Sequence, residues 1–331
     1  MKYSIIVPVY NRPDEIKELL DTMVEQSFEK EFEVVIIEDG SSISSKEIVE
    51  KYKDRIQVKY YYKENSGPGD SRNYGMRVAE GNYFIILDSD CLLPKYYLKN
   101  VDDFLQNNYV DCFGGADAAT TSFTTIQKAI NYAMTSFFTT GGIRGSKKSI
   151  SRFEPRSFNM GISKEAFEKT GGFGKIHPGE DPDLTIRLWK IGYCTSFIEK
   201  AFVYHKRRIS WKKFFLQVNK FGQTRPILNY WHPQTRKLIY WLPSFFVVGF
   251  FISILFSLFS VWAGIFIYAA YFLLIFIESV CKNKSLKIGI LSVWAVGVQF
   301  FGYGIGFLYS TFRLFRTKKT PEELFPKLFF K

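Results

Sequence analysis

Hydrophobic runs and amphipathic runs alternate along the first part of the chain. The apolar runs read SIIVPVY, FEVVIIED, IQVKYYYK and YFIILD. The segments between them read PDEIKELLDTMVEQS, SKEIVEKYKD and GDSRNYGMRVAE. In the first of these segments, apolar residues recur with the 3.6-residue period of a helix that packs one face on a sheet, at Ile16, Leu19, Leu20 and Met23. Strands separated by helical patterns predict an α/β fold with a parallel sheet and crossover helices.

Polar residues and glycines follow each of these predicted strands. In open sheets of this kind, ligands bind beyond the carboxyl ends of the strands, so we expect these residues to form one site. They are Pro8, Tyr10 and Asn11 after the first strand, Glu38, Asp39 and Gly40 after the second, Gly67, Gly69 and Arg72 after the third, and Asp88 and Asp90 after the fourth. The glycines permit close approach of the backbone, and Arg72 stands in a first helical turn, which suits a phosphate.

The two carboxylates of the sequence LDSD, Asp88 and Asp90, predict a metal site. Two acids close together at the end of a buried strand repel each other unless a cation lies beside them. Oxygen ligands suit Mg²⁺ or Mn²⁺, and a nucleoside diphosphate would complete the shell. His205, at the end of another apolar run, is expected to join this shell or to hold the diphosphate. The alternatives are that the two acids lie in a solvated turn and that His205 is an ordinary hydrogen-bonded histidine.

The composition changes in the last third of the chain, where Phe, Ile, Leu and Val dominate residues 238–312. Residues 243–277 contain no Asp, Glu, Lys or Arg, and about 20 apolar residues are enough for a helix to cross a bilayer. We therefore expect transmembrane segments near 243–259, 260–279 and 288–312. One of them is alternatively re-entrant or interfacial, because three full crossings would place the basic tail outside. A large buried helical domain is the alternative for the whole region.

Basic residues flank every one of these apolar segments, so the distribution of charge does not fix the topology. The amino-terminal sequence MKYSIIVPVYN lacks the pattern of a signal peptide. We therefore expect residues 1–237 to form a catalytic domain in the cytoplasm. Residues 238–331 are expected to form a multi-pass region in the inner membrane, followed by a basic tail.

The chain carries an excess of positive charge, with 44 Lys and Arg against 32 Asp and Glu. Such an excess favours an anionic partner, such as nucleic acid, a phosphorylated substrate or an acidic membrane. Nucleic acid is disfavoured, because the basic residues cluster beside the apolar segments rather than in a groove with aromatic residues. The four cysteines form no C-x-x-C pair, so neither a structural zinc site nor a disulfide framework is expected. The glycine motifs of dinucleotide folds and P-loops are missing.

Two stretches have the one-sided apolar pattern of a helix that lies in a membrane interface. The stretch near 209–222 carries Trp211, Phe214, Phe215 and Val218, and the earlier stretch carries Phe123, Ile126, Ile130, Met134 and Phe137. A helix that faces the protein core is the alternative for each. If both are interfacial, a binding site beside them opens toward the bilayer, which favours a lipid-linked substrate.

Six motifs occur in order over residues 3–210, namely IIVPVYNR, VVIIEDGS, SGPGDSRN, LDSD, FNMGISKEAFEKTGGF and GEDPDLTIRLWKIGY. Together they resemble the inverting family 2 glycosyltransferases, which have the GT-A fold, a mixed and mostly parallel sheet flanked by helices. The resemblance implies a nucleotide pocket and a metal, formed by Pro8, Tyr10, Asn11, Asp39, Arg72, Asp88 and Asp90. It also implies a catalytic base at Asp181 and a contact with substrate at Asn159. The Q-x-x-R-W motif of processive cellulose or hyaluronan synthases is missing, which disfavours a polymerising enzyme.

The transfer of a sugar needs charge stabilisation on the leaving diphosphate and removal of a proton from the attacking hydroxyl. A metal held by Asp90 would stabilise the diphosphate, and a carboxylate on the other side of the sugar would act as base. Asp181 is the candidate, because it follows a glycine-rich loop and precedes a helical run, and Glu180 is its close competitor at the substrate. Helix capping is the alternative for Asp181 and the expectation for Asp183.

The sequence therefore predicts a membrane-anchored, metal-dependent inverting glycosyltransferase. It would take a sugar from a nucleotide-diphosphate donor and pass it to a lipid-linked saccharide at the cytoplasmic face. Bacterial surface glycan synthesis is the setting that the resemblance implies. The alternatives are a polyprenyl-phosphate glycosyltransferase and a non-catalytic membrane scaffold that binds nucleotide sugars.

Overall fold

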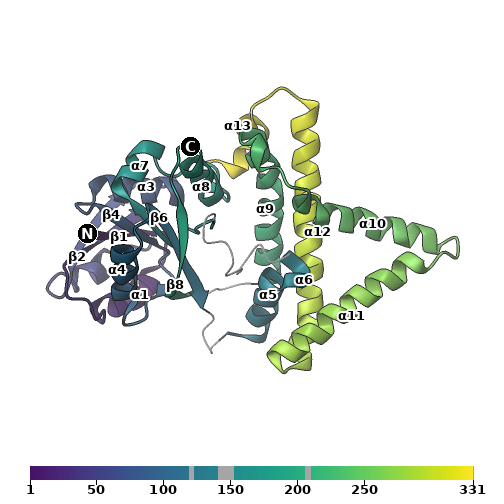
Figure 1. Ribbon diagram of the computed structural model, residues 1–331, viewed down its shortest axis with the longest axis horizontal. Coiled ribbons are helices and arrows are strands. Elements are labelled where there is room, and N and C mark those ends of the chain that lie inside the picture. The colour runs from purple at the N-terminus through teal and green to yellow at the C-terminus, as the bar shows by residue number, and fades with distance from the viewer. Residues whose placement is uncertain (119–122, 141–152, 206–209, 331) are drawn as a thin grey trace. The chain divides into compact units, whose positions relative to one another are not determined.

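The computed structural model describes residues 1–118, 123–140, 153–205 and 210–330 of the chain (Figure 1). Contacts within the chain divide it into two compact units. The first, here called the α/β unit, consists of residues 1–120, 148–206 and 329–331. The second, here called the helical unit, consists of residues 121–147 and 207–328.

An eight-stranded sheet forms the centre of the α/β unit, with the order β3-β2-β1-β4-β7-β6-β8-β5 among the described strands. The strands are β1 Tyr3–Val9, β2 Phe32–Asp39, β3 Gln57–Lys63, β4 Tyr83–Leu87, β5 Cys91–Leu92, β6 Cys112–Ala118, β7 Asn159–Ser163 and β8 Thr195–His205. The first four strands in the sheet order are parallel, whereas β7 runs antiparallel to both of its neighbours. The sheet is therefore mixed, and the four strands from the amino-terminal part of the chain are parallel, as the sequence predicted.

Helices cover both faces of this sheet. Successive residues of a strand point to opposite faces, so one strand contributes side chains to a core on each side. The helices are α1 Pro13–Val24, α2 Lys46–Glu50, α3 Pro68–Val78, α4 Tyr97–Asn107, α7 Lys164–Thr170 and α8 Glu180–Lys190. Ile5 of β1 lies in a core cluster with the apolar face predicted for α1, and Ile6 lies in a second cluster with Met76 of α3 and Leu184 of α8. The predicted period of α1 is thus confirmed, since Ile16, Leu19, Leu20 and Met23 are buried.

The helical unit contains three helices that are long and apolar enough to cross a membrane, by length and composition. These spans are Leu238–Ser257, Ala263–Asn283 and Leu286–Arg316. The helices of the unit are α5 Thr125–Thr135, α6 Phe137–Thr140, α9 Trp211–Trp231, α10 Leu242–Ser257, α11 Ala263–Asn283, α12 Leu286–Arg316 and α13 Pro321–Leu324, with short 3-10 helices at Pro233–Thr235, Leu238–Trp241 and Pro326–Leu328. The three predicted apolar segments are therefore helical.

Close packing of α9 against α12 depends on glycines. A Cβ atom on Gly222 of α9 would lie 2.1 Å from the carbonyl oxygen of Tyr303, and one on Gly306 of α12 would lie 2.3 Å from that of Asn219. Small residues let two helix backbones approach closely, which is the common form of helix packing in membranes.

The two stretches predicted to lie in a membrane interface are only partly exposed. Phe214 and Val218 of α9 are buried in a cluster with Ile130 and Met134 of α5 and with residues of α11 and α12. These four residues fit the alternative of a core-facing helix. Phe137, Phe215 and Leu216 are exposed, so an interfacial placement stays a prediction for that part of the surface.

Candidate active site

The carboxyl ends of β1, β2 and β4 lie at one edge of the sheet, because these strands are parallel neighbours. The register pairs Val9 of β1 with Glu38 of β2, and Asp39 of β2 with Lys63 of β3. The loops that leave this edge carry most of the predicted site residues. Asn11, Asp39 and Asp88 therefore come from three different strands to the same edge, which is where ligands bind in open α/β sheets.

Asp39 is buried and fixes the loop that leads into α3. Its Oδ1 accepts from the Lys63 Nζ at 2.6 Å and from the Ser66 N–H at 3.0 Å, and its Oδ2 accepts from the Gly67 N–H at 3.0 Å. Gly67 has a φ of 93°, which a glycine adopts without strain. Asp39 thus holds Gly67 at the start of α3, beside the expected nucleotide pocket.

Asn11 joins the loops that follow β1 and β2. Its Oδ1 accepts from the backbone N–H groups of Ser42 and Ile43 at 2.8 and 2.9 Å. Its φ of 53° lies in the left-handed region, which asparagine tolerates better than most residues. Pro8 is half-buried and the Tyr10 side chain is exposed. Asn11 therefore shapes the loop, and the roles of these residues in nucleotide binding stay predictions.

Arg72 of α3 lies at the centre of a charged network. Its Nη2 donates to Asp88 Oδ1 at 2.8 Å, and its Nη1 lies 3.3 Å from Glu180 Oε1. The guanidinium also lies 5.4 Å from the ring centroid of Phe173. The side chain is almost fully buried, and its Nε has no partner among the described residues. The sequence indicated a phosphate ligand for Arg72, whereas in the structure it connects Asp88 at the end of β4 with Glu180 at the start of α8.

Asp90 is paired with Arg12, whose Nη1 lies 2.6 Å from Asp90 Oδ2. Within the described ranges there is no group of three His, Cys, Asp or Glu side chains that could hold a metal. The backbone of His205 pairs with Cys91, which follows Asp90, but the His205 side chain lies outside the described part of the structure. Two carboxylates fit a metal that takes its other ligands from a diphosphate, and they do not fit a metal held by protein alone.

Glu180 and Asp181 begin helix α8 and have opposite electrostatic environments. Burial raises the pKa of Glu180, but the hydrogen bond from His177 at 2.8 Å and the charges of His177 and Arg72 outweigh it, so the net shift is downward. Burial raises the pKa of Asp181, and the negative charge of Glu180 raises it further. The two carboxyls thus divide into a charged partner of Arg72 and a group that can take a proton, a division typical of active sites.

One oxygen of the Asp181 carboxyl, Oδ1, is buried and has no hydrogen-bond partner in the described part of the chain. Asp183 differs from it, because Asp183 Oδ2 accepts from the Arg187 Nε at 2.9 Å one helical turn later. The N-cap of α8 is Gly179, and no side chain forms a capping hydrogen bond there. The expectation that Asp183 caps this helix was therefore wrong, because Asp183 lies inside the helix and pairs with Arg187. Within the residues that the structure describes, Asp181 has no such ion pair; its carboxyl has a hydrogen bond with the Ser157 side chain, and its Oδ1 is left with none.

Asn159 is completely buried at the start of β7. Its Oδ1 accepts from the Tyr97 hydroxyl at 2.6 Å, and its Nδ2 donates to the carbonyl oxygen of Ala201 at 2.8 Å. The side chain thus connects β7 to α4 and β8. A contact between Asn159 and substrate stays a prediction, and it would require the side chain to exchange one of these bonds.

A segment far away in the sequence also contributes to the site. Phe329 forms an antiparallel bridge with Ile176, and the Phe330 N–H donates to the Lys175 carbonyl at 3.1 Å. The Phe330 ring lies 5.6 Å from the ring of His177. It also fills the space over Gly67, where a Cβ atom would lie 2.3 Å from the ring.

Four contributors to the site were missed in the sequence, namely Arg12, Lys63, His177 and Phe330. Lys63 could have been found, because it ends the strand that follows Asp39 in the predicted parallel order. No local signal distinguishes His177, and nothing in the sequence places Phe330 next to a loop more than 150 residues earlier.

Comparison with known proteins identifies the family. Residues 4–171 match the sequence model described as glycosyl transferase family 2. The chain belongs to this family. The matched range contains Asp39, Arg72, Asp88 and Asp90, and it ends before Asp181. The family resemblance seen in the motifs is thereby confirmed.

Two curated relatives are enzymes named for poly(ribitol-phosphate). The beta-N-acetylglucosaminyltransferase TarS of Staphylococcus aureus is 40% identical over 114 residues, 34% of this chain and 20% of TarS. The beta-glucosyltransferase of Bacillus spizizenii is 36% identical over 115 residues, 34% of this chain and 18% of that protein. The matched part of the chain therefore spans about a fifth of the length of these curated relatives.

Solved structures share the fold. The crystal structure of Staphylococcus aureus TarS 1–349 in complex with UDP-GlcNAc has a TM-score of 0.51 and 20% identity, covering 96% of this chain and 93% of that one. The mannosyltransferase PcManGT from Pyrobaculum calidifontis, in complex with GDP-Man and Mn²⁺, has a TM-score of 0.61 and 16% identity, covering 90% of this chain and 86% of that one. The predicted fold class is thus confirmed.

Proposed function

We propose that this protein transfers a sugar from a nucleotide-diphosphate donor to an acceptor, with inversion at the sugar carbon. The observation that carries the proposal is the network centred on Arg72. It connects Asp88, at the strand end where the donor is expected, with Glu180, the neighbour of Asp181, whose Oδ1 has no hydrogen-bond partner in the described structure. Donor-side and acceptor-side carboxylates are thereby held by one buried side chain.

The nucleotide is expected at the edge of the sheet formed by the loops after β1, β2 and β3. Asp39 offers carboxylate oxygens there, although they are shared with Lys63 and Gly67. Pro8 in β1, together with Tyr10 and Asn11 in the loop that follows it, provides the other proposed contacts. Support for a sugar nucleotide comes from the family and from the two neighbouring structures, which contain UDP-GlcNAc and GDP-Man.

Asp88 and Asp90 are the residues that would hold Mn²⁺ or Mg²⁺, with His205 as a possible third ligand on the strand beside them. Such an ion, when bound, supplies positive charge to the departing diphosphate. Arg12 is about half exposed and pairs with Asp90, so it can turn toward a phosphate oxygen when the carboxylate takes a new partner. Arg72 is buried and keeps Asp88 oriented.

Asp181 acts as the base in the proposed reaction. The acceptor hydroxyl attacks the anomeric carbon from the face opposite the diphosphate, and its proton passes to the Asp181 carboxylate. The bond between the anomeric carbon and the diphosphate oxygen breaks as the new glycosidic bond forms. The products are the inverted glycoside and a nucleoside diphosphate. Glu180 stays ionised beside Arg72 and His177 and takes no part in the proton transfer.

The proposed acceptor is a lipid-linked saccharide at the cytoplasmic face of the inner membrane. Three helices that could cross a membrane support a membrane location, and the names of the two relatives are compatible with bacterial surface glycan synthesis. Polyprenyl phosphate is the alternative acceptor. Mass spectrometry of the lipid product separates the two, because only the saccharide acceptor yields a new bond between two sugars.

The function is tested by incubating the full chain in membranes with a panel of nucleotide sugars, Mn²⁺ or Mg²⁺, and a bacterial lipid extract. We expect release of one nucleoside diphosphate that depends on the extract. Binding of a donor without any release across the panel would contradict catalysis and would favour the non-catalytic scaffold.

A further inference from the structure

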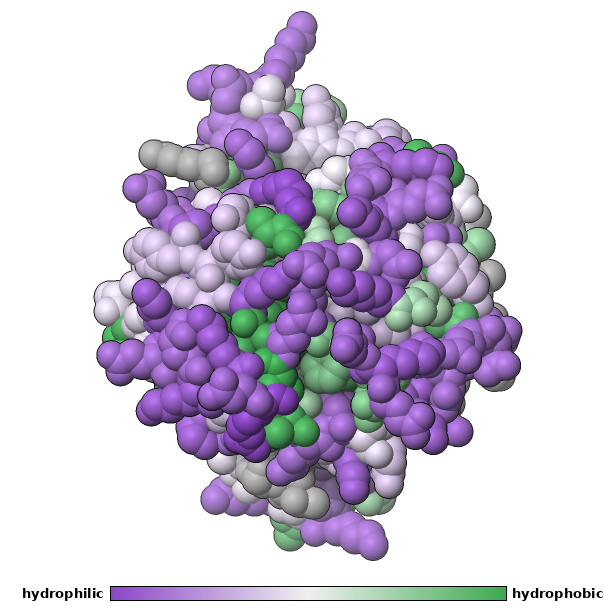
Figure 2. Space-filling view, turned by 90° about the vertical axis from the view of Figure 1, so that its left-hand side faces the viewer, coloured by the Kyte–Doolittle hydropathy of each residue, from purple (hydrophilic) through white to green (hydrophobic). Residues whose placement is uncertain are grey.

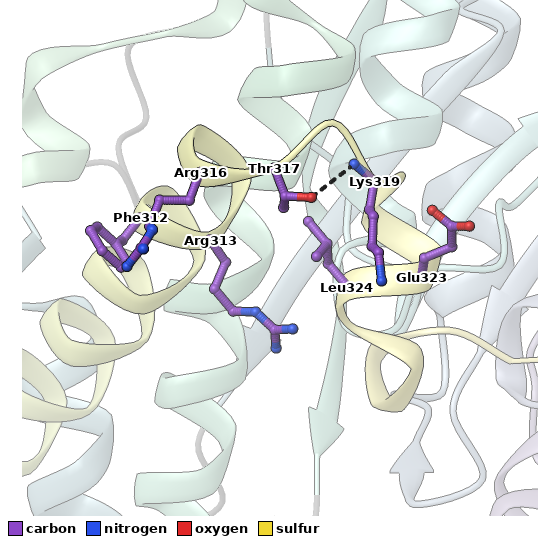
Figure 3. A pocket seen from close by; sticks show the side chains of 7 residues that line it. All are labelled: Phe312, Arg313, Arg316, Thr317, Lys319, Glu323 and Leu324. Atoms are coloured by element: carbon purple, nitrogen blue, oxygen red, sulfur yellow. Dashed lines mark hydrogen bonds between the residues drawn. The ribbon is translucent and has the colours of Figure 1, made fainter.

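A cavity of about 340 Å³ lies in the helical unit at the carboxyl end of α12 (Figure 3). It is lined by Phe312, Arg313, Arg316, Thr317, Lys319, Glu323 and Leu324. Three of these side chains are cations and one is an acid. The cavity therefore has the charge of a site for an anion, and the catalytic residues described above do not contribute to it.

The acid of this cavity already has a local role. Glu323 Oε2 accepts from the Thr320 N–H at 2.9 Å, as part of the capping box of α13. Among the residues that the structure describes, no carboxylate forms an ion pair with Arg313, Arg316 or Lys319. Three positive side chains thus line one cavity together with a single acid that forms no ion pair with them, so the cavity keeps a net positive charge that an anion would neutralise.

The guanidinium of Arg313 is held in place before any ligand binds. Its Nη1 donates to the Tyr309 hydroxyl at 2.7 Å. The group also lies 5.5 Å from the ring centroid of Tyr309 and 5.4 Å from that of Phe325. Contacts of this kind reduce the rotamer freedom that binding would otherwise remove, and the planar guanidinium is suited to phosphate oxygens. In Figure 3 the Arg313 and Lys319 side chains both extend downward, whereas the Arg316 guanidinium lies beside the ring of Phe312, 5.3 Å from its centroid.

The position of the cavity along the chain indicates where its anion comes from. Helix α12 is one of the three candidate membrane spans, and apolar side chains such as Phe312 and Phe315 are exposed in its last turns. The cations follow directly after these apolar residues. A helix that leaves the hydrocarbon at this point places its next basic residues at the level of the lipid phosphates.

We propose that this cavity binds the phosphate group of an anionic membrane lipid. Arg313 contacts the phosphate oxygens, Arg316 and Lys319 add positive charge to the cavity, and Phe312 and Leu324 contact the adjoining apolar part of the lipid. Binding at this place anchors the carboxyl end of α12 to one leaflet and gives the enzyme a preference for anionic bilayers. The proposal does not depend on the catalytic function.

The test uses the full chain in a neutral detergent and native mass spectrometry to count bound phosphatidylglycerol. The variant Arg313→Gln with Arg316→Gln removes two cations from the cavity. The control, Lys237→Gln with Lys287→Gln, removes two exposed cations elsewhere in the helical unit. We expect the cavity variant to weaken binding of phosphatidylglycerol by roughly tenfold or more, while the control binds like the original chain.

Further arms of the same experiment identify the source of the phosphate. Phosphatidylcholine is expected to bind weakly, and inorganic phosphate at millimolar concentration is expected to compete with phosphatidylglycerol only in chains with an intact cavity. Binding of inorganic phosphate as tightly as the lipid would overturn the assignment to a lipid. Equal retention of phosphatidylglycerol by the cavity variant and the control would overturn the site itself.

Discussion

The two units of this protein use apolar residues in different ways. In the α/β unit, helices such as α1 bury one apolar face on the sheet, and hydrophilic residues cover most of the side of the molecule seen in Figure 2. In α10 and α11 apolar residues surround the whole helix. Only 11% of the most apolar part of the span Leu238–Ser257, and of α11, is buried, against 44% for α12. A helix whose apolar residues lie on one face indicates water on its other face, whereas a helix that is apolar on all sides indicates a lipid environment.

The units also differ in how they use charge. In the α/β unit, buried carboxylates form ion pairs with basic side chains at the candidate active site. Asp39 pairs with Lys63, and Glu180 pairs with Arg72. In the helical unit, the cations at the end of α12 have no such partners among the described residues. The first arrangement fits the proposed chemistry inside the fold, and the second fits the proposed contact with an outside anion.

The largest effect is expected from removing the proposed base. Asp181→Asn keeps the size of the side chain but cannot accept the proton, so the rate of sugar transfer should fall by about 10² to 10⁴. The thermal unfolding temperature should stay close to that of the original chain, because Asp181 Oδ1 has no partner to lose in the described structure.

Two neighbouring variants serve as controls for Asp181. Glu180→Gln leaves Arg72 and His177 without their shared carboxylate, so it should lower the unfolding temperature as well as activity. Asp183→Asn removes the ion pair with Arg187 and should keep most of the activity. A more severe loss of activity in Asp183→Asn than in Asp181→Asn would make our assignment of the base wrong.

The contrast between the surface of the helical unit and that of the α/β unit is tested by placing the same charge on each. Leu273→Lys puts a cation in the middle of α11, where the side chain is exposed, and at the centre of a bilayer this costs about 2.5 to 3.5 kcal/mol or more. We expect much less protein in the membrane fraction after carbonate extraction. Tyr62→Lys, at an exposed position of β3, should have no such effect. Equal yields from the two variants would argue against a lipid environment for α11.

The activity should depend on pH through Asp181. Burial, together with the charge of Glu180, raises the pKa of Asp181 to about 6. The base works only when it is ionised, so the rate should be constant above this pH and fall about tenfold for each pH unit below it. The measurement is kcat/KM between pH 4.5 and 8, because this ratio reports the pKa of the free enzyme. A rate that is unchanged down to pH 4.5 would exclude Asp181 as the titrating group.

The smallest expected effect concerns Phe330, which contacts His177 and through it Glu180. Phe330→Ala should lower the turnover number by about fivefold, because such packing changes typically cost about 1 kcal/mol. Phe330→Leu should restore part of the loss, and Phe315→Ala, which changes a fully exposed phenylalanine of α12, should have no effect. Combining Phe330→Ala with His177→Ala should add nothing to His177→Ala alone, and full additivity would show that Phe330 acts by another route.

Much of the fold could be predicted from sequence because it depends on local patterns. The alternation of apolar runs and the period of Ile16, Leu19 and Leu20 gave the strands and α1, and the uncharged stretch gave α10 and α11. The pattern of α9 was ambiguous, since a one-sided apolar face fits both an interface and a core. Phe214 and Val218 face the core because α12 offers a glycine-lined surface, a feature that depends on contacts between distant segments.

The site was predictable as a set of strand ends but not as a set of contacts. Position in a parallel sheet brings Asp39 and Asp88 to one edge, and this follows from the order of the elements. The pairing of Arg72 with Glu180 depends on how α8 packs on the sheet, and the contact of Phe330 with His177 depends on the path of the last part of the chain. Neither has a signature in the sequence around it.

The central claim is that Asp88 and Asp90 hold a divalent ion together with the diphosphate of a sugar nucleotide. The most direct test is to titrate the purified full chain with UDP-GlcNAc and GDP-mannose in Mn²⁺ and in a chelator, by calorimetry, and to repeat the titration with Asp90→Ala. We predict tight binding of one of these donors in Mn²⁺, with a large loss of affinity both in the chelator and in the variant. Equal affinity under all three conditions would contradict the account.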